Sequence, residues 1–160
     1  MGRAARAGPA RPGAIAAERS ADLRFLLEPF DRLSREYPST RDGLSLTERR
    51  LLAAVAAGAG TAGEAFVRAA AREARPFLGD VWAYAALKRL ARAGTPLVAA
   101  DRAVDRQTPL RVTDARTRVL AGAEDHVALN GIDRSVGGVH LSGDHVPWRW
   151  DDGVEAIVAR

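Results

Sequence analysis

The side chains best suited to chemistry are concentrated between His126 and Asp151. This segment contains all three histidines of the chain and two of its three tryptophans. Its imidazole, carboxylate, amide and guanidinium groups could together move a proton or hold an anion. We therefore treat the following residues as one candidate ligand-binding cluster: Asn130, Asp133, Arg134, His140, Arg149 and Asp151.

Two kinds of site fit these residue types, but neither has a recognised spacing. His126, Asp133 and His140 could hold zinc or iron, although their separation matches no known ligand pattern. His140 could also act as a general base oriented by Asp133, with Arg134 or Arg149 holding an anion. The same charges could equally form a structural ion pair. Because the chain has no nucleophile elbow, phosphate loop or cysteine, we predict no metal and no cofactor, assign no catalytic residue and favour a protein that is not an enzyme.

The same segment contains signals for turns and for a core. Asn130-Gly131 lies between apolar residues and predicts a tight turn. Gly137-Gly138 permits a bend or a close backbone approach. Trp148 and Trp150 could complete a thin core, because truncating a buried tryptophan typically costs roughly 3–5 kcal/mol.

Alternating residue types predict two strands in this region. Residues 139–141 and 148–150 each place apolar side chains on both sides of one polar residue, His140 or Arg149. The short segment 142–146 between them predicts one antiparallel hairpin. Side chains two positions apart share a face of a strand, so we expect His140 and Arg149 to lie together on the outer face.

Composition narrows the class of protein. The 160 residues suit one domain with a tail, and the net charge is +4. Residues 1–20 lack large apolar side chains and predict a disordered leader, which carries most of the positive charge. No segment is apolar and long enough to predict a membrane span or a secretory signal. We therefore expect a cytoplasmic protein without a membrane partner.

The middle of the chain predicts a series of short helices. The first is expected at residues 29–36. Two capping boxes, which begin at Ser45 and Thr61, predict the next two helices, and Gly79 precedes a third. The helix that begins after Thr61 is expected to bury Phe66, Val67 and Ala70. The third is expected to bury Trp82, Ala86, Leu87 and Leu90.

The hydrophobic period changes after Gly94. Residues 96–100 and 109–112 predict two short strands joined by a charged loop, and Thr113 begins a further helix that ends at Gly122. Three helices, a hairpin and a helix are the order of a winged-helix domain. We predict an α+β fold, mainly α: a winged-helix-like domain at residues 21–122 and a C-terminal β-hairpin extension at residues 123–160, packed on the same core.

The predicted recognition helix is poorly suited to reading DNA. Base contacts need polar or basic side chains near the start of that helix, and this one begins Gly79-Asp-Val-Trp-Ala-Tyr. Asp80 would repel phosphate, and the wing at residues 101–106 alternates opposite charges. Binding to a specific nucleic acid is therefore not expected of this domain.

Four motifs, at residues 37–49, 76–80, 128–141 and 148–151, carry a resemblance to a known family. The last, Trp148-Arg149-Trp150-Asp151, is the most specific. They resemble the C-terminal region of an uncharacterised bacterial domain-of-unknown-function family, loosely labelled sigma-factor-like. The resemblance implies a family but no activity, and relatives often carry a further N-terminal domain. This chain departs from the pattern at Ser135, where an aromatic is usual, and at Arg116, where glycine is usual.

These observations favour a bacterial interaction or regulatory module whose partner is a protein. The alternative is a small-ligand-binding protein or hydrolase-type enzyme that uses the C-terminal Asp/His/Arg cluster, with a small anionic ligand. A DNA-binding regulator is the third possibility.

Overall fold

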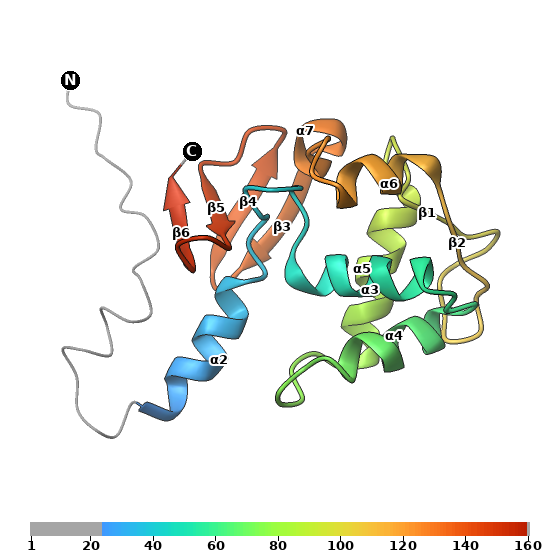
Figure 1. Ribbon diagram of the computed structural model, residues 1–160, viewed down its shortest axis with the longest axis horizontal. Helices are drawn as coiled ribbons and strands as arrows, with labels where there is room; N and C mark the ends of the chain where they lie inside the picture. Colours follow the sequence, from blue (N-terminus) through green and yellow to red (C-terminus); the bar gives the residue numbers. More distant parts are fainter. Residues whose placement is uncertain (1–23, 160) are drawn as a thin grey trace.

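The computed structural model describes residues 24–159, so the leader predicted at residues 1–20 lies outside the described residues. Within that range the chain forms six helices and three antiparallel strand pairs, which confirms the α+β class (Figure 1). None of these helices has both the length and the apolar character that a membrane crossing requires.

The middle of the chain forms a helical half, coloured from turquoise through green and yellow to orange in Figure 1. Its side chains pack into one core that includes Leu51, Leu87, Leu97 and Val119. The elements are α3 (Leu46–Ala56), α4 (Ala62–Ala70), α5 (Asp80–Arg92), β1 (Val98–Ala99), β2 (Arg111–Val112) and α6 (Asp114–Leu120). The two short strands pair with each other, as the sequence predicts.

The capping signals place the helix starts correctly. The Ser45 hydroxyl accepts a hydrogen bond from the Glu48 backbone N–H, and the Glu48 carboxylate accepts one from the Ser45 N–H. This reciprocal pair satisfies two backbone donors that a helix end otherwise leaves free. Thr61 caps α4 through the Glu64 N–H alone, because the Glu64 carboxylate accepts from the Gly60 N–H instead.

The predicted inward faces of α4 and α5 are partly wrong. Val67 and Trp82 are each 64% exposed, while Ala65, Ala69 and Ala83 are buried in their place. Alanine lets two helix backbones approach closely, so the alanine stripes form the contacts between helices. Val67 and Trp82 lie one or two positions away from these alanines and therefore point outward.

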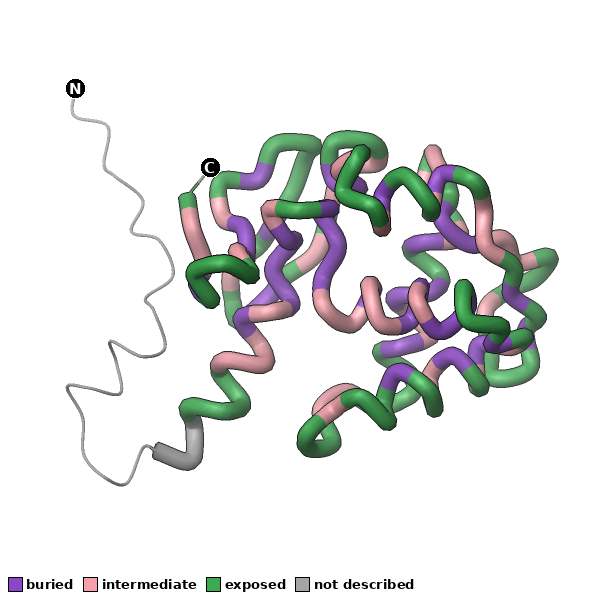
Figure 2. Tube along the Cα trace, in the orientation of Figure 1, coloured by how far each residue is buried: buried purple, intermediate pink, exposed green. Residues whose placement is uncertain are grey.

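The two ends of the described chain form a β half. It contains α2 (Arg24–Ser34), which begins earlier than predicted and has Pro29 inside it. The remaining elements are α7 (His126–Asn130), β3 (Ile132–Val136), β4 (Val139–Gly143), β5 (Trp148–Asp151) and β6 (Ala156–Ala159). The sequence predicts that residues 123–160 pack on the core of the helical domain. Instead a second cluster of buried side chains forms, in which Val127, Leu141 and Trp150 pack with Tyr37. Buried stretches of chain accordingly occur in both halves (Figure 2).

The strand pairing differs from the predicted hairpin. β3 pairs with β4 and β5 pairs with β6, whereas β4 and β5 belong to different sheets. Gly137 and Gly138, at φ +55° and +82°, form the two-residue turn that joins β3 to β4. The predicted Asn130-Gly131 hairpin turn is instead the end of α7, where Gly131 adopts φ +70°.

The segment between α2 and α3 connects the two halves. Thr40 donates to the backbone oxygen of Trp150 at 2.8 Å, and Trp150 donates to that of Pro38 at 2.9 Å. Gly43, at φ +72°, lies against the start of α7. A Cβ atom on Gly43 would lie 2.8 Å from the backbone nitrogens of His126 and Val127.

We expect the Gly43→Ala substitution to destabilise the protein by about 3 kcal/mol, because strain at a positive φ and a clash with backbone add together. Gly58→Ala is the matched control, because Gly58 also has positive φ (+88°) but a Cβ atom added there would have no other atom within 4 Å. That variant should lose only about 1–2 kcal/mol. Urea unfolding measures both values, and equal losses would show that the contact with α7 contributes nothing.

Candidate functional site

The six residues of the predicted cluster do not form one site. Asp133 and His140 do meet: His140 Nε2 lies 2.7 Å from an Asp133 carboxylate oxygen. Ser142 and Ser135 lie opposite these two residues in the β3–β4 register, so all four side chains occupy one face. The side chains of Asp133 and His140 are 85% and 61% exposed. Water therefore surrounds this pair, and it lacks the enclosed environment that strengthens catalytic electrostatics.

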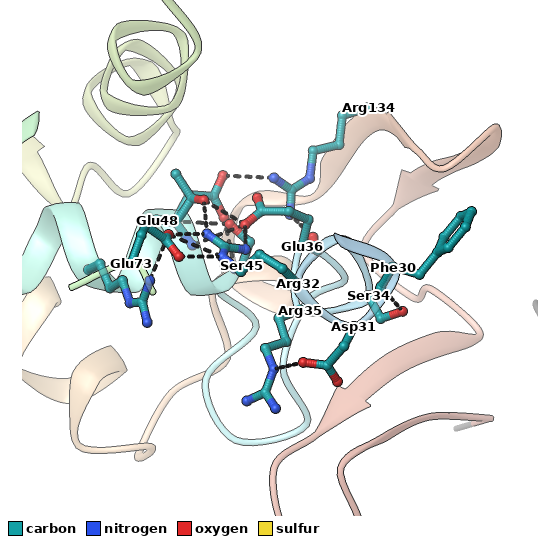
Figure 3. A network of polar contacts seen from close by, with 12 residues as sticks. Phe30, Asp31, Arg32, Ser34, Arg35, Glu36, Ser45, Glu48, Glu73 and Arg134 are labelled. Atoms are coloured by element: carbon teal, nitrogen blue, oxygen red, sulfur yellow. Dashed lines mark hydrogen bonds and ion pairs between the residues drawn. The ribbon is translucent and has the colours of Figure 1, made fainter. Parts of the chain in front are cut away.

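Arg134 lies on the opposite face of the same hairpin and points into the protein. Its Nη1 lies 3.3 Å from a Glu48 carboxylate oxygen, and its Nη2 donates to the backbone oxygen of Glu36 at 2.8 Å. Figure 3 shows this guanidinium approaching the α3 carboxylate from β3. The alternation of β3 thus separates Arg134 from its sequence neighbour Asp133.

Arg149 occupies a third location. Its side chain is buried and binds the Asp125 carboxylate at 3.2 Å, so it does not share a face with the exposed His140. The predicted arrangement of these two residues is therefore wrong. That prediction depends on a hairpin between β4 and β5. In the structure β4 pairs with β3 and β5 pairs with β6 instead.

Asp151 and Asn130 each stabilise a local connection. Hydrogen bonds from the backbone of Val154 and Gly153, and from the Thr40 hydroxyl, lower the pKa of Asp151. Asn130 accepts a hydrogen bond from the Thr95 N–H at 2.6 Å and donates to the Thr95 carbonyl at 3.1 Å. Among the described residues, no three histidine, cysteine or acidic side chains come close enough together to hold a metal ion.

A buried polar site lies elsewhere, and the sequence does not reveal it. Glu48 is buried, and its carboxylate lies 3.3 Å from guanidinium nitrogens of both Arg134 and Arg89. Burial raises the pKa of this carboxyl, but the charges of Arg134 and Arg89, together with His126 and the Ser45 N–H, lower it to about 2. Glu48 is therefore ionised at neutral pH.

A second network of ion pairs lies beside Glu48 and holds α2 against the helical half (Figure 3). Arg32 binds Glu36 and Glu73, each at 2.7 Å, and its guanidinium lies over the Phe77 ring. Arg50 also binds Glu73, at 2.6 Å. Two cations and two carboxylates thus fasten the α4–α5 loop to α2 and α3.

His126 has a defined tautomer in this environment. Its Nδ1 lies 3.0 Å from the amide nitrogen of Asn130, whose amide oxygen already accepts from the Thr95 N–H. Asn130 must therefore donate to Nδ1, which leaves the proton of a neutral imidazole on Nε2. Burial, and to a lesser degree the charge of Arg134, lower the pKa of His126, although Glu48 partly opposes them.

The surface of the predicted recognition helix is the other feature of interest. Val81 and Trp82 are 73% and 64% exposed at the first turn of α5, directly after the exposed Asp80. Two arginines at the predicted wing are neutralised locally, because Arg111 binds Asp101 at 2.9 Å and Arg102 approaches Asp105 at 3.4 Å, which leaves Arg106 as the one wing arginine without an ion pair among the described residues. The wing and the start of α5 therefore offer no concentrated positive surface.

We expect the Glu48→Gln substitution to cost about 3 kcal/mol at neutral pH, because two guanidinium groups lose their anion. The pKa of Glu48 is lower in the folded state than its ordinary value of 4.5. Its contribution is therefore full above that value and is lost as the pH falls toward about 2. Urea unfolding across this range should show a steep acid loss in the native protein and a smaller one in the variant. Glu28→Gln, which breaks an exposed pair with Arg75, should cost less than about 1 kcal/mol.

Comparison of the chain with protein-family models, curated proteins and solved structures finds no match. The resemblance to a bacterial family therefore stays a prediction.

Proposed function

We propose that the protein is a bacterial, cytoplasmic winged-helix-like module that binds another protein through the exposed face of α5. Its helical half has the corresponding element order, with α3, α4 and α5 followed by the β1–β2 pair. A further short pairing joins the α3–α4 connection to the strand that leaves the wing. Leu110 donates to Gly60 and Ala62 donates to Thr108, both at 3.0 Å. This third partner in the sheet supports the winged-helix interpretation.

The exposure of Trp82 is the observation that carries the proposal. A tryptophan on a rigid helix supplies a large contact area, and residues of this type dominate the binding energy of many interfaces. Val81 extends the apolar surface. Val81, Ala85 and Lys88 follow one another at helical spacing, and Lys88 has no acidic partner among the residues described. The partner surface that fits is an apolar pocket for Trp82 with an acidic rim near Lys88.

The alternatives have less support from the geometry. The residues of the C-terminal cluster predicted for a ligand or a hydrolytic reaction contact different partners and do not share one site, so they do not favour an enzyme. A sequence-specific DNA reader would need donors at the start of α5, where Asp80, Val81 and Trp82 lie.

Site-specific photo-crosslinking can test this proposal. A photoreactive phenylalanine at position 82, introduced in cells that make the full chain, should give a discrete protein adduct that mass spectrometry can identify. The same residue at position 107, which is exposed in the wing, should not. With the purified partner, Trp82→Ala should weaken binding by about 2 kcal/mol, roughly thirtyfold, and Gln107→Ala should have no measurable effect.

Other results would contradict the proposal. Equal crosslinking at positions 82 and 107, or a partner whose affinity does not depend on Trp82, would remove α5 as the binding surface. Nanomolar, site-selective binding to duplex DNA that survives Trp82→Ala would instead favour a regulator that reads DNA.

A further inference from the structure

A cavity of about 590 Å³ lies where the helical half meets the β half. Its wall includes Glu48 from α3, Arg89 and Arg92 from α5, His126 from α7 and Arg134 from β3. The polar groups therefore converge from four elements, and α3, α5 and the consecutive α7 and β3 come from three distant parts of the sequence. A concave space with a few convergent polar groups is the usual form of a small-molecule site. Three members of the cluster predicted from the sequence, Asn130, Asp133 and Arg134, also line this cavity, whereas Glu48, Arg89 and Arg92 were not part of that cluster.

Three arginines and three carboxylates line this cavity, so positive charge exceeds negative charge only on the side that Arg89, Arg92 and Arg134 share with Glu48, here called the inner wall. Glu48 is one carboxylate shared by two guanidinium groups, those of Arg89 and Arg134. Arg92 is exposed and has no acidic partner in the described part of the chain. These groups leave an excess of cationic donors facing one space. Glu48 also holds two of the arginines in place before any ligand arrives, which reduces the ordering cost of binding.

Several donors on this wall remain available. The exposed Arg92 guanidinium makes no hydrogen bond or ion pair within the described residues, whereas the Nε atom of Arg134 has no partner but is buried and so is closed to a ligand. The Nε2–H of His126 is a neutral donor, because Asn130 occupies Nδ1. Arginine forks and a neutral imidazole N–H are groups that bind the oxygens of a phosphate or a carboxylate.

The outer edge of the cavity limits the charge of a ligand. Asp133 and Asp144 lie there, and their carboxylates are exposed and contact His140 and His145. These carboxylates would repel a polyanion such as a nucleic-acid backbone. They leave room for a small molecule that places a single oxyanion at the inner wall.

We propose that this cavity binds a small ligand through one phosphate or carboxylate group, held by Arg89, Arg92, Arg134 and the Nε2–H of His126. This site is independent of the protein-binding surface proposed for α5. Trp82 and Lys88 do not line the cavity, and Arg92 was not used in that proposal. Either proposal can therefore fail without the other.

Calorimetric titration of the full chain with inorganic phosphate and, separately, with succinate tests the site at constant ionic strength, set with sodium chloride. At least one of the two anions should bind with a dissociation constant of about 1 mM or tighter. Comparison of the two identifies which oxyanion the site prefers. On saturation, the ring ¹⁵N and ¹H resonances of His126 should shift, which a remote surface site would not cause.

Arg92→Ala should weaken binding roughly tenfold or more, because it removes one charged donor. It should leave the melting temperature nearly unchanged, since the exposed Arg92 side chain makes no hydrogen bond or ion pair within the described residues. Lys88→Ala removes an equal charge from the same helix but outside the cavity, and should change binding less than about twofold. The proposal is overturned if neither anion binds more tightly than about 10 mM, if Arg92→Ala binds normally, or if Lys88→Ala has the same effect.

Discussion

The fold depends on the buried negative charge of Glu48, which lies at the junction of its two halves. Glu48 caps α3 through Ser45, contacts Arg89 on α5 and receives Arg134 from β3. A buried carboxylate is costly unless several partners compensate it, so this contact constrains where each partner element can lie. Aliphatic packing is confined to two separate clusters, and this ionic contact lies between them. This ionic contact therefore helps to set the relative placement of the halves, together with hydrogen bonds such as those between Asn130 and Thr95.

Local signals in the sequence predicted local structure well. The capping residues at Ser45 and Thr61 placed two helix starts, because capping depends only on side chains three residues apart. The strands near residues 98 and 111 were also found from a change in hydrophobic period. The side of a helix that is buried was harder to predict. Trp82 is more apolar than Ala83, yet the close approach of neighbouring helices selects the alanine.

Long-range pairing could not be predicted in the same way. Alternation around His140 and Arg149 correctly indicated strands, but it contains no information about which strand pairs with which. The two glycines at 137–138 were the signal for the true hairpin, because both adopt positive φ, which a two-residue turn requires. Glu48 was identified only as a capping residue. Its burial depends on Arg134, which lies 86 positions later in the chain.

The connection between Pro38 and Trp150 has a consequence for synthesis on the ribosome. The helical half is continuous from residue 46 to residue 120, so its contacts can form as soon as that stretch has emerged. The β half joins Tyr37 and Thr40 to residues more than a hundred positions later. Such distant contacts close late and fold slowly. The apolar side chains of the segment before α3 therefore remain exposed to solvent until the last strands leave the exit tunnel. During this interval the helical half of the nascent chain can be folded while the β half is still unfolded. Aggregation or chaperone binding competes with folding at this stage.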